Sequence, residues 1–169
     1  MRILVMSDTH GEVNSIDQVR QHVGSVDAVF HCGDSELDVN HTSLQSAFVV
    51  RGNCDWDSSF PEEVFAEING VKIFMAHGHV LQVKSTMLPI SYRAQELGAD
   101  VVLFGHSHLL GTEQIEGTLF VNPGSLELPR GRLEKSYAII EKSPVQWTVT
   151  FFSNENETLE KVTFKITEK

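Results

Sequence analysis

Residues 2–11 of the chain, RILVMSDTHG, join an apolar segment directly to a polar cluster. Residues 2–6 predict a buried strand, and Asp8 and His10 follow at its carboxyl end. The same arrangement recurs after the apolar segments 27–31, 47–50, 71–75 and 101–104. The clusters that follow these segments are CGD at 32–34, RGNCD at 51–55, HGH at 77–79 and GHSH at 105–108. Because ligands of α/β sheets gather beyond the carboxyl ends of the strands, we expect these clusters to meet at one edge.

The remaining pattern predicts one α/β domain over residues 1–169. Helical spacing of apolar residues marks 14–23 and 85–97, with Pro89 either in the first turn of the second helix or kinking it. Segments 64–68 and 71–75 indicate a hairpin around Asn69-Gly70. Further strands are expected at 112–115, 119–121, 136–141, 145–152 and 158–166. Strands that first alternate with helices and then follow one another favour an α/β domain whose layers include two sheets.

The composition excludes several classes of protein. Apolar residues make up 41% of the 169 residues and charged residues 21%, which is a globular balance. No apolar run reaches the roughly 18 residues that span a bilayer, and Ser7-Asp8 interrupts the N-terminal run too early for a signal peptide, so we expect a cytoplasmic protein without membrane contact. The net charge of −10 disfavours long nucleic acid as a partner. Small phosphorylated substrates stay open, because bound cations reverse the field locally.

The polar clusters offer carboxylate, amide and imidazole ligands, a set that suits manganese, iron, zinc, nickel or cobalt. The candidate metal ligands are Asp8, His10, Asp34, Asn53, His77, His106 and His108. This set fits one cation poorly but fits two cations that share a carboxylate. Asp34 is the natural bridge, because both of its oxygens can accept. Two cations about 3.5–4 Å apart would activate water and clamp the oxygens of a displacement at phosphorus.

The polar clusters, taken in order, resemble the motif set of the calcineurin-like metallophosphoesterases. The motifs are Asp8-x-His10, Gly33-Asp34, Gly52-Asn53-x-Asp55, His77-Gly78-His79 and Gly105-His106-x-His108. One such motif is a weak signal, whereas the ordered set at strand ends is specific. The chain length, the segment Gly-Asn-Cys-Asp and the segment Asn122-Pro123-Gly124-Ser125 are similar to the small YfcE-type phosphodiesterases of bacteria and archaea.

The resemblance implies a four-layer α/β/β/α sandwich with two mixed sheets and a metal site at the carboxyl ends of strands. It implies two divalent cations, manganese before nickel, iron, zinc or cobalt. By resemblance, Asp8, His10, Asp34 and His108 hold one cation, and Asp34, Asn53, His77 and His106 hold the other. The implied reaction is hydrolysis of small phosphodiesters by attack of a metal-bridging hydroxide on phosphorus.

The candidate catalytic residues are Asp34, Asn53, Cys54, Asp55 and His77. Cys54 is a departure from the superfamily, because many members have histidine at this position, although the YfcE-type proteins also have cysteine. A neutral thiol donates a proton less readily than imidazolium does. We therefore expect activity to favour diesters with activated or aryl-like leaving groups, or substrates that bring their own proton donor.

Three assignments stay open at this point. His79 either replaces His77 as a ligand or lines the substrate site. Asp55 either orients a neighbouring ligand or caps a turn. Residues 122–125 either place Ser125 and backbone N–H groups near the metals or simply end a strand.

Other functions of the same fold are alternatives. The small retromer subunit of eukaryotes resembles this family and acts as a protein-interaction scaffold, but it has lost ligand residues. The present chain keeps His10 with the full ligand set, and unpaired buried polar groups without a metal would be destabilising. A phosphomonoesterase or a nuclease are the enzymatic alternatives. The strand-rich C-terminal third offers a surface for a homodimer.

Overall fold

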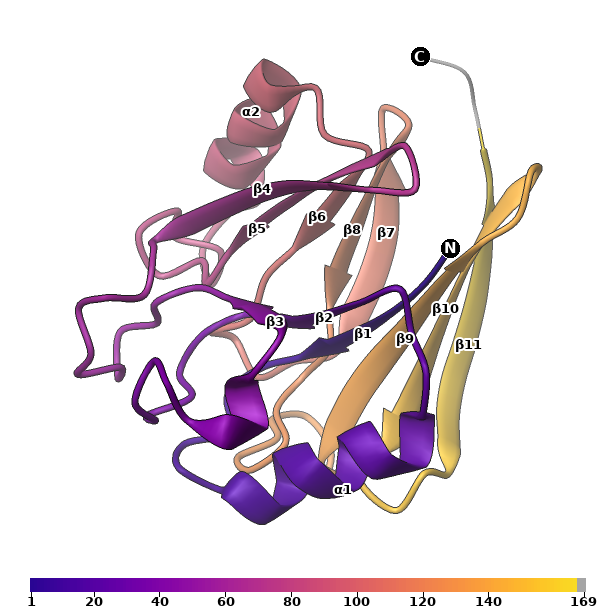
Figure 1. The fold of residues 1–169 in the computed structure, drawn as a ribbon. Coiled ribbons are helices and arrows are strands. Elements are labelled where there is room, and N and C mark those ends of the chain that lie inside the picture. Colours follow the sequence, from indigo (N-terminus) through magenta and orange to yellow (C-terminus); the bar gives the residue numbers. More distant parts are fainter. Residues whose placement is uncertain (167–169) are drawn as a thin grey trace.

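The computed structural model describes residues 1–166, and two β-sheets packed against each other form its centre (Figure 1). The first sheet has the strand order β11-β10-β9-β1-β2-β3. Strands β1 (Arg2–Met6), β2 (Ala28–His31) and β3 (Ala47–Val49) are parallel. Strands β9 (Ser136–Lys142), β10 (Gln146–Ser153) and β11 (Thr158–Lys165) extend this sheet in antiparallel pairs. The first sheet is therefore mixed.

The second sheet is also mixed, with the strand order β4-β5-β6-β8-β7. Strands β5 (Val71–Ala76), β6 (Val101–Leu103) and β8 (Thr118–Asn122) are parallel. Strands β4 (Glu63–Ile68) and β7 (Gly111–Ile115) pair antiparallel at the two edges. The β4–β5 hairpin turns at Asn69-Gly70, where both residues have positive φ, as the sequence predicts.

Three hydrophobic clusters separate four layers. Within β1, Ile3 and Val5 point into the space between the sheets, and Leu4 and Met6 point to the outer face, as a period of two requires. Helix α1 (Val13–Val23) covers that outer face. Helix α2 (Leu88–Leu97) covers the outer face of the second sheet (Figure 1). The α/β/β/α sandwich expected from the sequence is confirmed.

The predicted strands agree with the structure to within one residue at each end, but the second helix does not. Helix α2 begins at Leu88 and not at residue 85, with Pro89 in its first turn. The ring of proline suits this place, because the first N–H groups of a helix have no partner within it. The short 3-10 helix η1 (Thr42–Leu44) was not predicted. Within residues 1–166, no helix is long and apolar enough to cross a bilayer.

The carboxyl ends of five strands meet at one end of the sandwich, as expected. Within the first sheet, Asp8 N donates to Gly33 O over 3.0 Å. Within the second, Gly105 N donates to His77 O over 3.0 Å. Several contacts join the sheets here; among them, His106 N donates to Asp8 Oδ2, and His77 Nδ1 contacts Cys32 O. The polar clusters therefore come from both sheets.

Candidate metal centre

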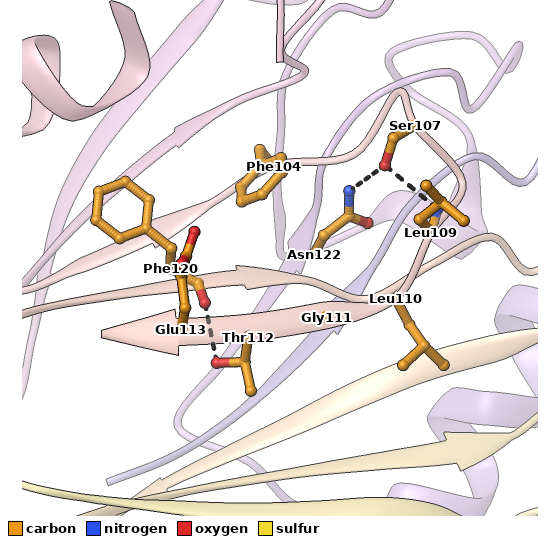
Figure 2. A pocket seen from close by; sticks show the side chains of 9 residues that line it. All are labelled: Phe104, Ser107, Leu109, Leu110, Gly111, Thr112, Glu113, Phe120 and Asn122. Carbon is orange, nitrogen blue, oxygen red and sulfur yellow. Dashed lines mark hydrogen bonds between the residues drawn. The ribbon is translucent and has the colours of Figure 1, made fainter. Parts of the chain in front are cut away.

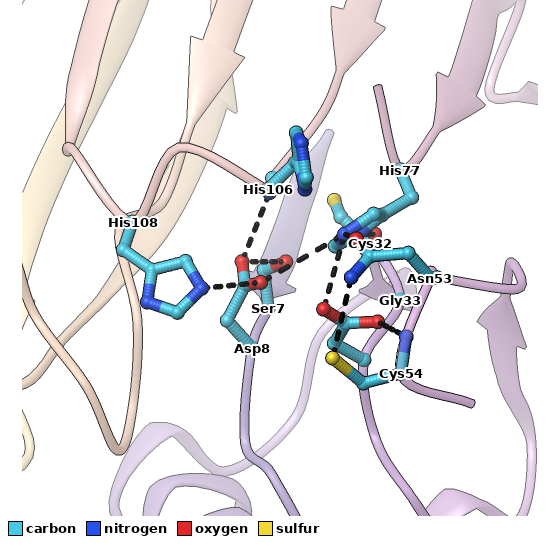
Figure 3. A network of polar contacts seen from close by, with 12 residues as sticks. Ser7, Asp8, Cys32, Gly33, Asn53, Cys54, His77, His106 and His108 are labelled. Carbon is cyan, nitrogen blue, oxygen red and sulfur yellow. Dashed lines mark hydrogen bonds and ion pairs between the residues drawn. The ribbon is translucent and has the colours of Figure 1, made fainter. Parts of the chain in front are cut away.

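The predicted ligands lie on the loops that directly follow β1, β2, β3, β5 and β6 (Figure 3). Most of them have left-handed backbone conformations, which residues other than glycine seldom adopt. The residues with positive φ are Asp8 (55°), His10 (45°), Asp34 (53°), His106 (65°) and His108 (60°). Such conformations cost energy and persist where the surrounding structure holds them, which is common at functional sites.

Two glycines let the ligand loops approach each other closely. A Cβ atom at Gly52 would overlap Asp34 Oδ1 and the Asp34 backbone nitrogen. A Cβ atom at Gly105 would overlap Ser7 Oγ and lie 2.7 Å from Asp8 Oδ2. Glycine is therefore needed at both positions, because a side chain there would collide with Asp34 or with Ser7 and Asp8.

Asp8 lies at the centre of the cluster and is fully buried. Its Oδ2 accepts hydrogen bonds from Ser7 Oγ (2.6 Å) and from His106 N (3.2 Å). Its Oδ1 accepts no conventional hydrogen bond, although it lies 3.1 Å from His108 Nε2 and 4.0 Å from His77 Nε2. A buried carboxylate oxygen is costly without a partner, so this atom indicates that a cation or a proton belongs beside it.

Three histidines present the same ring nitrogen to the cluster. Nδ1 of His10 contacts Glu36 Oε1 at 2.7 Å, and Nδ1 of His77 contacts Cys32 O at 2.7 Å. Nδ1 of His108 contacts Leu128 O at 2.6 Å. Each partner is an acceptor, so Nδ1 carries the proton and, in the neutral ring, Nε2 keeps its lone pair. This is the arrangement in which histidine binds a metal.

The free Nε2 atoms face other acceptors. Nε2 of His10 lies 3.4 Å from Nε2 of His108. Nε2 of His77 lies 3.3 Å from Asp34 Oδ2 and 3.2 Å from Asn53 Oδ1 (Figure 3). Lone pairs that converge in this way repel one another unless positive charge lies between them. The donor set therefore fits divalent cations.

The pKa values of the cluster indicate the same preference for positive charge. Burial acts to lower the pKa of His77, but the hydrogen bond and charge of Asp34, together with Asp8, outweigh it and raise that pKa. The contact with Asp8 raises the pKa of His108 against the effect of burial. Burial acts to raise the pKa of Asp34, yet contact with His77 brings it well below its usual range. The negative charges that raise the pKa values of His77 and His108 would equally favour a bound cation.

Two groups of close ligand atoms share Asp8 in the structure. One is Asp8, His10 and His108, and the other is Asp8, Asp34 and His77, with the ligand atoms of each group within 4.8 Å of one another. Asn53 adjoins the second group through its contact with His77. Asp8 therefore lies between His108 and His77, whereas Asp34 contacts one histidine, His77, and the predicted role of Asp34 as the bridge stays a prediction.

His106 and His79 lie farther out. The ring of His106 is 5.1 Å from that of His77 between centroids, and His79 is 5.4 Å from His77. Among the described residues, neither belongs to a group of close ligand atoms. Burial and then the charge of His77 lower the pKa of His106 to about 4 and also lower that of His79. Nδ1 of His79 is buried without a hydrogen bond, which leaves it free to contact a ligand.

Cys54 and Asp55 both contact Asp34, in different ways. Cys54 N donates to Asp34 Oδ1 over 2.7 Å. Burial, and then the neighbouring charge of Asp34, raise the pKa of the Cys54 thiol to about 11. Asp55 is buried, and its carboxylate accepts four hydrogen bonds: from the backbone nitrogens of Asp34, Glu36 and Gly52 and from Ser35 Oγ. Asp55 therefore joins the loop after β2 to the loop after β3.

The segment 122–125 forms hydrogen bonds with the ligand loops that follow β1 and β6. Ser125 Oγ donates to Asp8 O over 2.7 Å. Asn122 Nδ2 donates to Gly105 O over 3.0 Å and to Ser107 Oγ over 2.9 Å.

Glu36, whose carboxylate contacts His10, was not predicted from the sequence as a residue of the site. Its only sequence signal is an acidic residue two positions after Asp34, which is common in loops.

A cavity of about 320 Å³ lies next to the 105–108 loop, against β7 and β8 (Figure 2). It is lined by Phe104, Phe120 and Leu109, with Glu113 as its single charged residue. Ser107 and Asn122 form the hydrogen bond drawn at its rim. Of the residues that line it, none belongs to the metal-ligand groups, so the chemistry lies beside this cavity and not in it.

Known proteins share both the motifs and the fold. Residues 1–143 match the model of the calcineurin-like phosphoesterase superfamily domain. The chain is 41% identical to the probable metallophosphoesterase YsnB of Bacillus subtilis (strain 168), over 99% of each chain. A crystal structure of a conserved protein from Streptococcus pneumoniae TIGR4, described as a predicted phosphoesterase, has a TM-score of 0.93 and 36% identity, over 97% of each chain.

A more distant structure shares the fold alone. YfcE, a phosphoesterase from E. coli, has a TM-score of 0.70 at 20% identity, over 99% of the present chain and all of its own. The family model, the relative and the metal-ligand groups agree with the resemblance read from the sequence. The chain belongs to the calcineurin-like phosphoesterase superfamily.

Proposed function

We propose that the protein is a metal-dependent phosphodiesterase that hydrolyses small phosphodiesters at a centre of two divalent cations. The observation that carries this proposal is the convergence of lone pairs: Nε2 of His10 and His108 lie 3.4 Å apart beside the unpartnered Oδ1 of Asp8. When bound, the cations supply activation of water and stabilisation of the negative charge that develops at phosphorus. Manganese is the first candidate, with nickel, iron, zinc and cobalt as alternatives.

The ligand assignment is that of the family motifs. One cation is held by Asp8, His10, Asp34 and His108, and the other by Asp34, Asn53, His77 and His106. The partners on Nδ1 orient three of the imidazoles, which keeps Nε2 directed at the metals. His79, with its free Nδ1, lies beside this set and lines the substrate site.

Cys54 and Asp55 have different roles in this scheme. The Cys54 thiol stays protonated near neutral pH and donates weakly, so cleavage depends on a leaving group that departs without strong protonation. Asp55 makes all its contacts with the protein and is a positioning residue for Asp34 and Glu36. The substrates we expect are therefore diesters with aryl or otherwise acidic leaving groups.

The test combines metal analysis with an assay on bis(4-nitrophenyl) phosphate. The wild-type protein should bind close to two equivalents of manganese and hydrolyse the diester. Asp34→Ala should lose most of the metal and at least about 100-fold of the activity, because both cations depend on it. Asp17→Ala, an exposed residue on α1, is the matched control and should keep both.

Three outcomes would contradict the proposal. A fully active Asp34→Ala protein would refute the shared carboxylate. A wild-type protein that binds no metal and hydrolyses no ester would favour the scaffold alternative. Faster hydrolysis of 4-nitrophenyl phosphate than of the diester would identify a phosphomonoesterase instead.

A further inference from the structure

Trp56 is a large exposed apolar residue next to the metal centre. The chain has two tryptophans, and they differ sharply: Trp147 is 3% exposed in the core, whereas Trp56 is 66% exposed. Trp56 comes directly after Asn53-Cys54-Asp55 in the loop that follows β3. Single exposed apolar residues are ordinary on protein surfaces, so exposure alone does not indicate a function for Trp56. Its contacts with neighbouring residues are therefore needed as evidence.

The backbone on both sides of Trp56 is held by aspartates. Asp55 accepts hydrogen bonds from the nitrogens of the neighbouring ligand loop, including Asp34 N at 2.8 Å. Asp57 accepts from Val39 N and Ser59 N, each at 2.9 Å. The indole itself is attached at one point, because Nε1 donates to Glu36 O over 3.3 Å. The backbone at the indole is therefore held on both sides, and the ring has one hydrogen bond while most of its surface faces solvent.

The attachment point places the indole at one end of the metal centre. The Glu36 side chain contacts His10 Nδ1 at 2.7 Å, and its backbone carbonyl accepts from the indole. The ligand atoms of His10, Glu36 and Cys54 lie within 4.8 Å of one another. Trp56 is thus joined through Glu36 to His10, at the end of the metal centre where the Cys54 thiol also lies.

We propose that Trp56 is a specificity-determining residue, on which a planar aromatic substituent of the substrate, a phenyl ring or a nucleobase, stacks. This inference rests on the proposed phosphodiesterase function and narrows its substrates to diesters with at least one aromatic substituent. A tryptophan side chain has only two rotatable bonds, so it loses little conformational entropy when it binds such a ring. Stacking of a base on an aromatic side chain contributes roughly 1–3 kcal/mol and tolerates different rings.

The preference for aromatic groups has a second, independent basis in the chemistry of Cys54. A thiol donates a proton weakly, which favours aryl leaving groups over alkyl ones. Trp56, two residues farther along the chain, would bind the same kind of group. For aryl esters, recognition and chemistry therefore favour the same group, whereas a nucleotide ester would gain from recognition alone.

The experiment measures binding of three phosphate monoesters to the zinc-loaded protein by calorimetry: phenyl phosphate, thymidine 5′-phosphate and methyl phosphate. All three offer the same dianion to the metals, and two carry a planar ring. Trp56→Ala should weaken binding of the two aromatic esters by about 5- to 100-fold and of methyl phosphate by less than about 3-fold. Trp56→Phe, which keeps a ring but not the N–H, should retain most of the aromatic preference.

A matched control is Tyr92→Ala. Tyr92 is 65% exposed, which is nearly the exposure of Trp56, but it lies on α2 in a groove formed with Glu116 and Thr118. This variant should bind all three esters as the wild type does. In the wild type, the aromatic esters should also quench the fluorescence of the exposed indole, while methyl phosphate should not.

Equal weakening of all three esters in Trp56→Ala or Trp56→Phe would overturn the proposal, because it would show that the indole only positions Glu36 and His10. Unchanged binding of all three would overturn it as well. The outcome of this binding experiment is independent of the outcome of the hydrolysis assay. If the wild-type protein hydrolyses no diester yet loses aromatic binding in Trp56→Ala, the function proposed above fails and the aromatic subsite stands.

Discussion

At the scale of single residues, the partner on Nδ1 decides what a histidine can offer to the site. His77 and His108 donate to backbone carbonyls, which no substitution removes. His10 instead contacts the carboxylate of Glu36. Glu36 is thus the one orienting group of the three that mutation can test. Glu36 belongs to none of the sequence motifs, yet its substitution would test directly how the orientation of His10 affects metal binding.

Glu36→Ala should weaken metal binding by about 10- to 100-fold, because His10 loses the partner that sets its tautomer and orientation. Glu36→Gln, which still accepts from Nδ1, should lose less. Competition with a fluorescent chelator measures the affinity. The exposed residue Glu160 on β11 supplies the control, and Glu160→Ala should bind metal normally. Unchanged affinity in Glu36→Ala would show that His10 needs no such support.

Cys54→His should change how the rate depends on the leaving group. The thiol keeps its proton, since its pKa is raised to about 11 by burial and by Asp34, whereas imidazolium is a good acid near neutral pH. We expect hydrolysis of diesters with alkyl leaving groups to rise by up to about 100-fold and that of 4-nitrophenyl esters to change little. A series of diesters of graded leaving-group pKa measures this, and identical slopes in the two proteins would refute it.

His31 should make the metal-free protein less stable in acid. The ring is fully buried, with Nδ1 accepting from Gly33 N and Nε2 donating to Thr9 Oγ1, so neutral His31 is satisfied and protonated His31 is not. Burial lowers its pKa to about 4 from 6.5. A lowered histidine pKa means that the unfolded chain binds more protons, so stability is complete above pH 6.5 and falls toward pH 4.

The expected loss of unfolding free energy over this range is about 3 kcal/mol. Urea unfolding of the chelator-treated protein at several pH values measures it. His31→Gln, which does not titrate, should show a flatter dependence. An equally steep decline in that variant would assign the acid sensitivity to other groups.

At the scale of elements, the ligand loops are stabilised by hydrogen bonds to one another. Asp55 on the loop after β3 accepts from the loop after β2, and Ser125 on the segment after β8 donates to Asp8 after β1. Gly52 and Gly105 leave the space that these contacts need. The loops therefore form one supported unit, in which a change in one loop displaces ligands in another.

Asp55→Asn should lower the unfolding free energy by about 2–4 kcal/mol and weaken metal binding as well, because an amide NH₂ would face N–H donors where a carboxylate oxygen accepted. Chemical denaturation and metal titration measure the two effects. Asp57→Asn, on the same loop but at the surface, should leave the metal affinity unchanged. Normal metal binding in Asp55→Asn would show that Asp55 does not position Asp34.

At the scale of the whole molecule, the metal site lies where the two sheets meet. Asp8 and Asp34 follow strands of the first sheet, and His77 and His108 follow strands of the second. Cations bound between them would join the sheets at one end of the hydrophobic core that Ile3 and Val101 help to form. Metal binding is therefore expected to stabilise the entire fold and not only the loops.

Addition of manganese to the metal-free protein should raise the unfolding free energy by about 2.7 kcal/mol per site at a free concentration 100 times the Kd. For a domain of this size, that is a rise of roughly 5–10 °C in Tm per site. Thermal denaturation with and without chelator measures it. Asp34→Ala should lose most of the rise. A Tm that does not respond to metal would contradict a site that joins the two sheets.

The sequence by itself determined the strands, the family and the side chains at the site. Each motif directly follows an apolar run, so Asp8, Asp34 and His77 can be identified from local pattern alone. The start of α2 and the helix η1 could not, because turn residues there give no periodic signal.

Only the tertiary structure decided which sheet each strand joins, the left-handed backbones of the ligands and the partners of their imidazoles. Glu36 beside His10, and Leu128 beside His108, are contacts between residues 26 and 20 positions apart. The hydrogen bond of the Trp56 indole is a contact of the same kind, over 20 positions. Such contacts arise when loops pack together, and no local pattern records them.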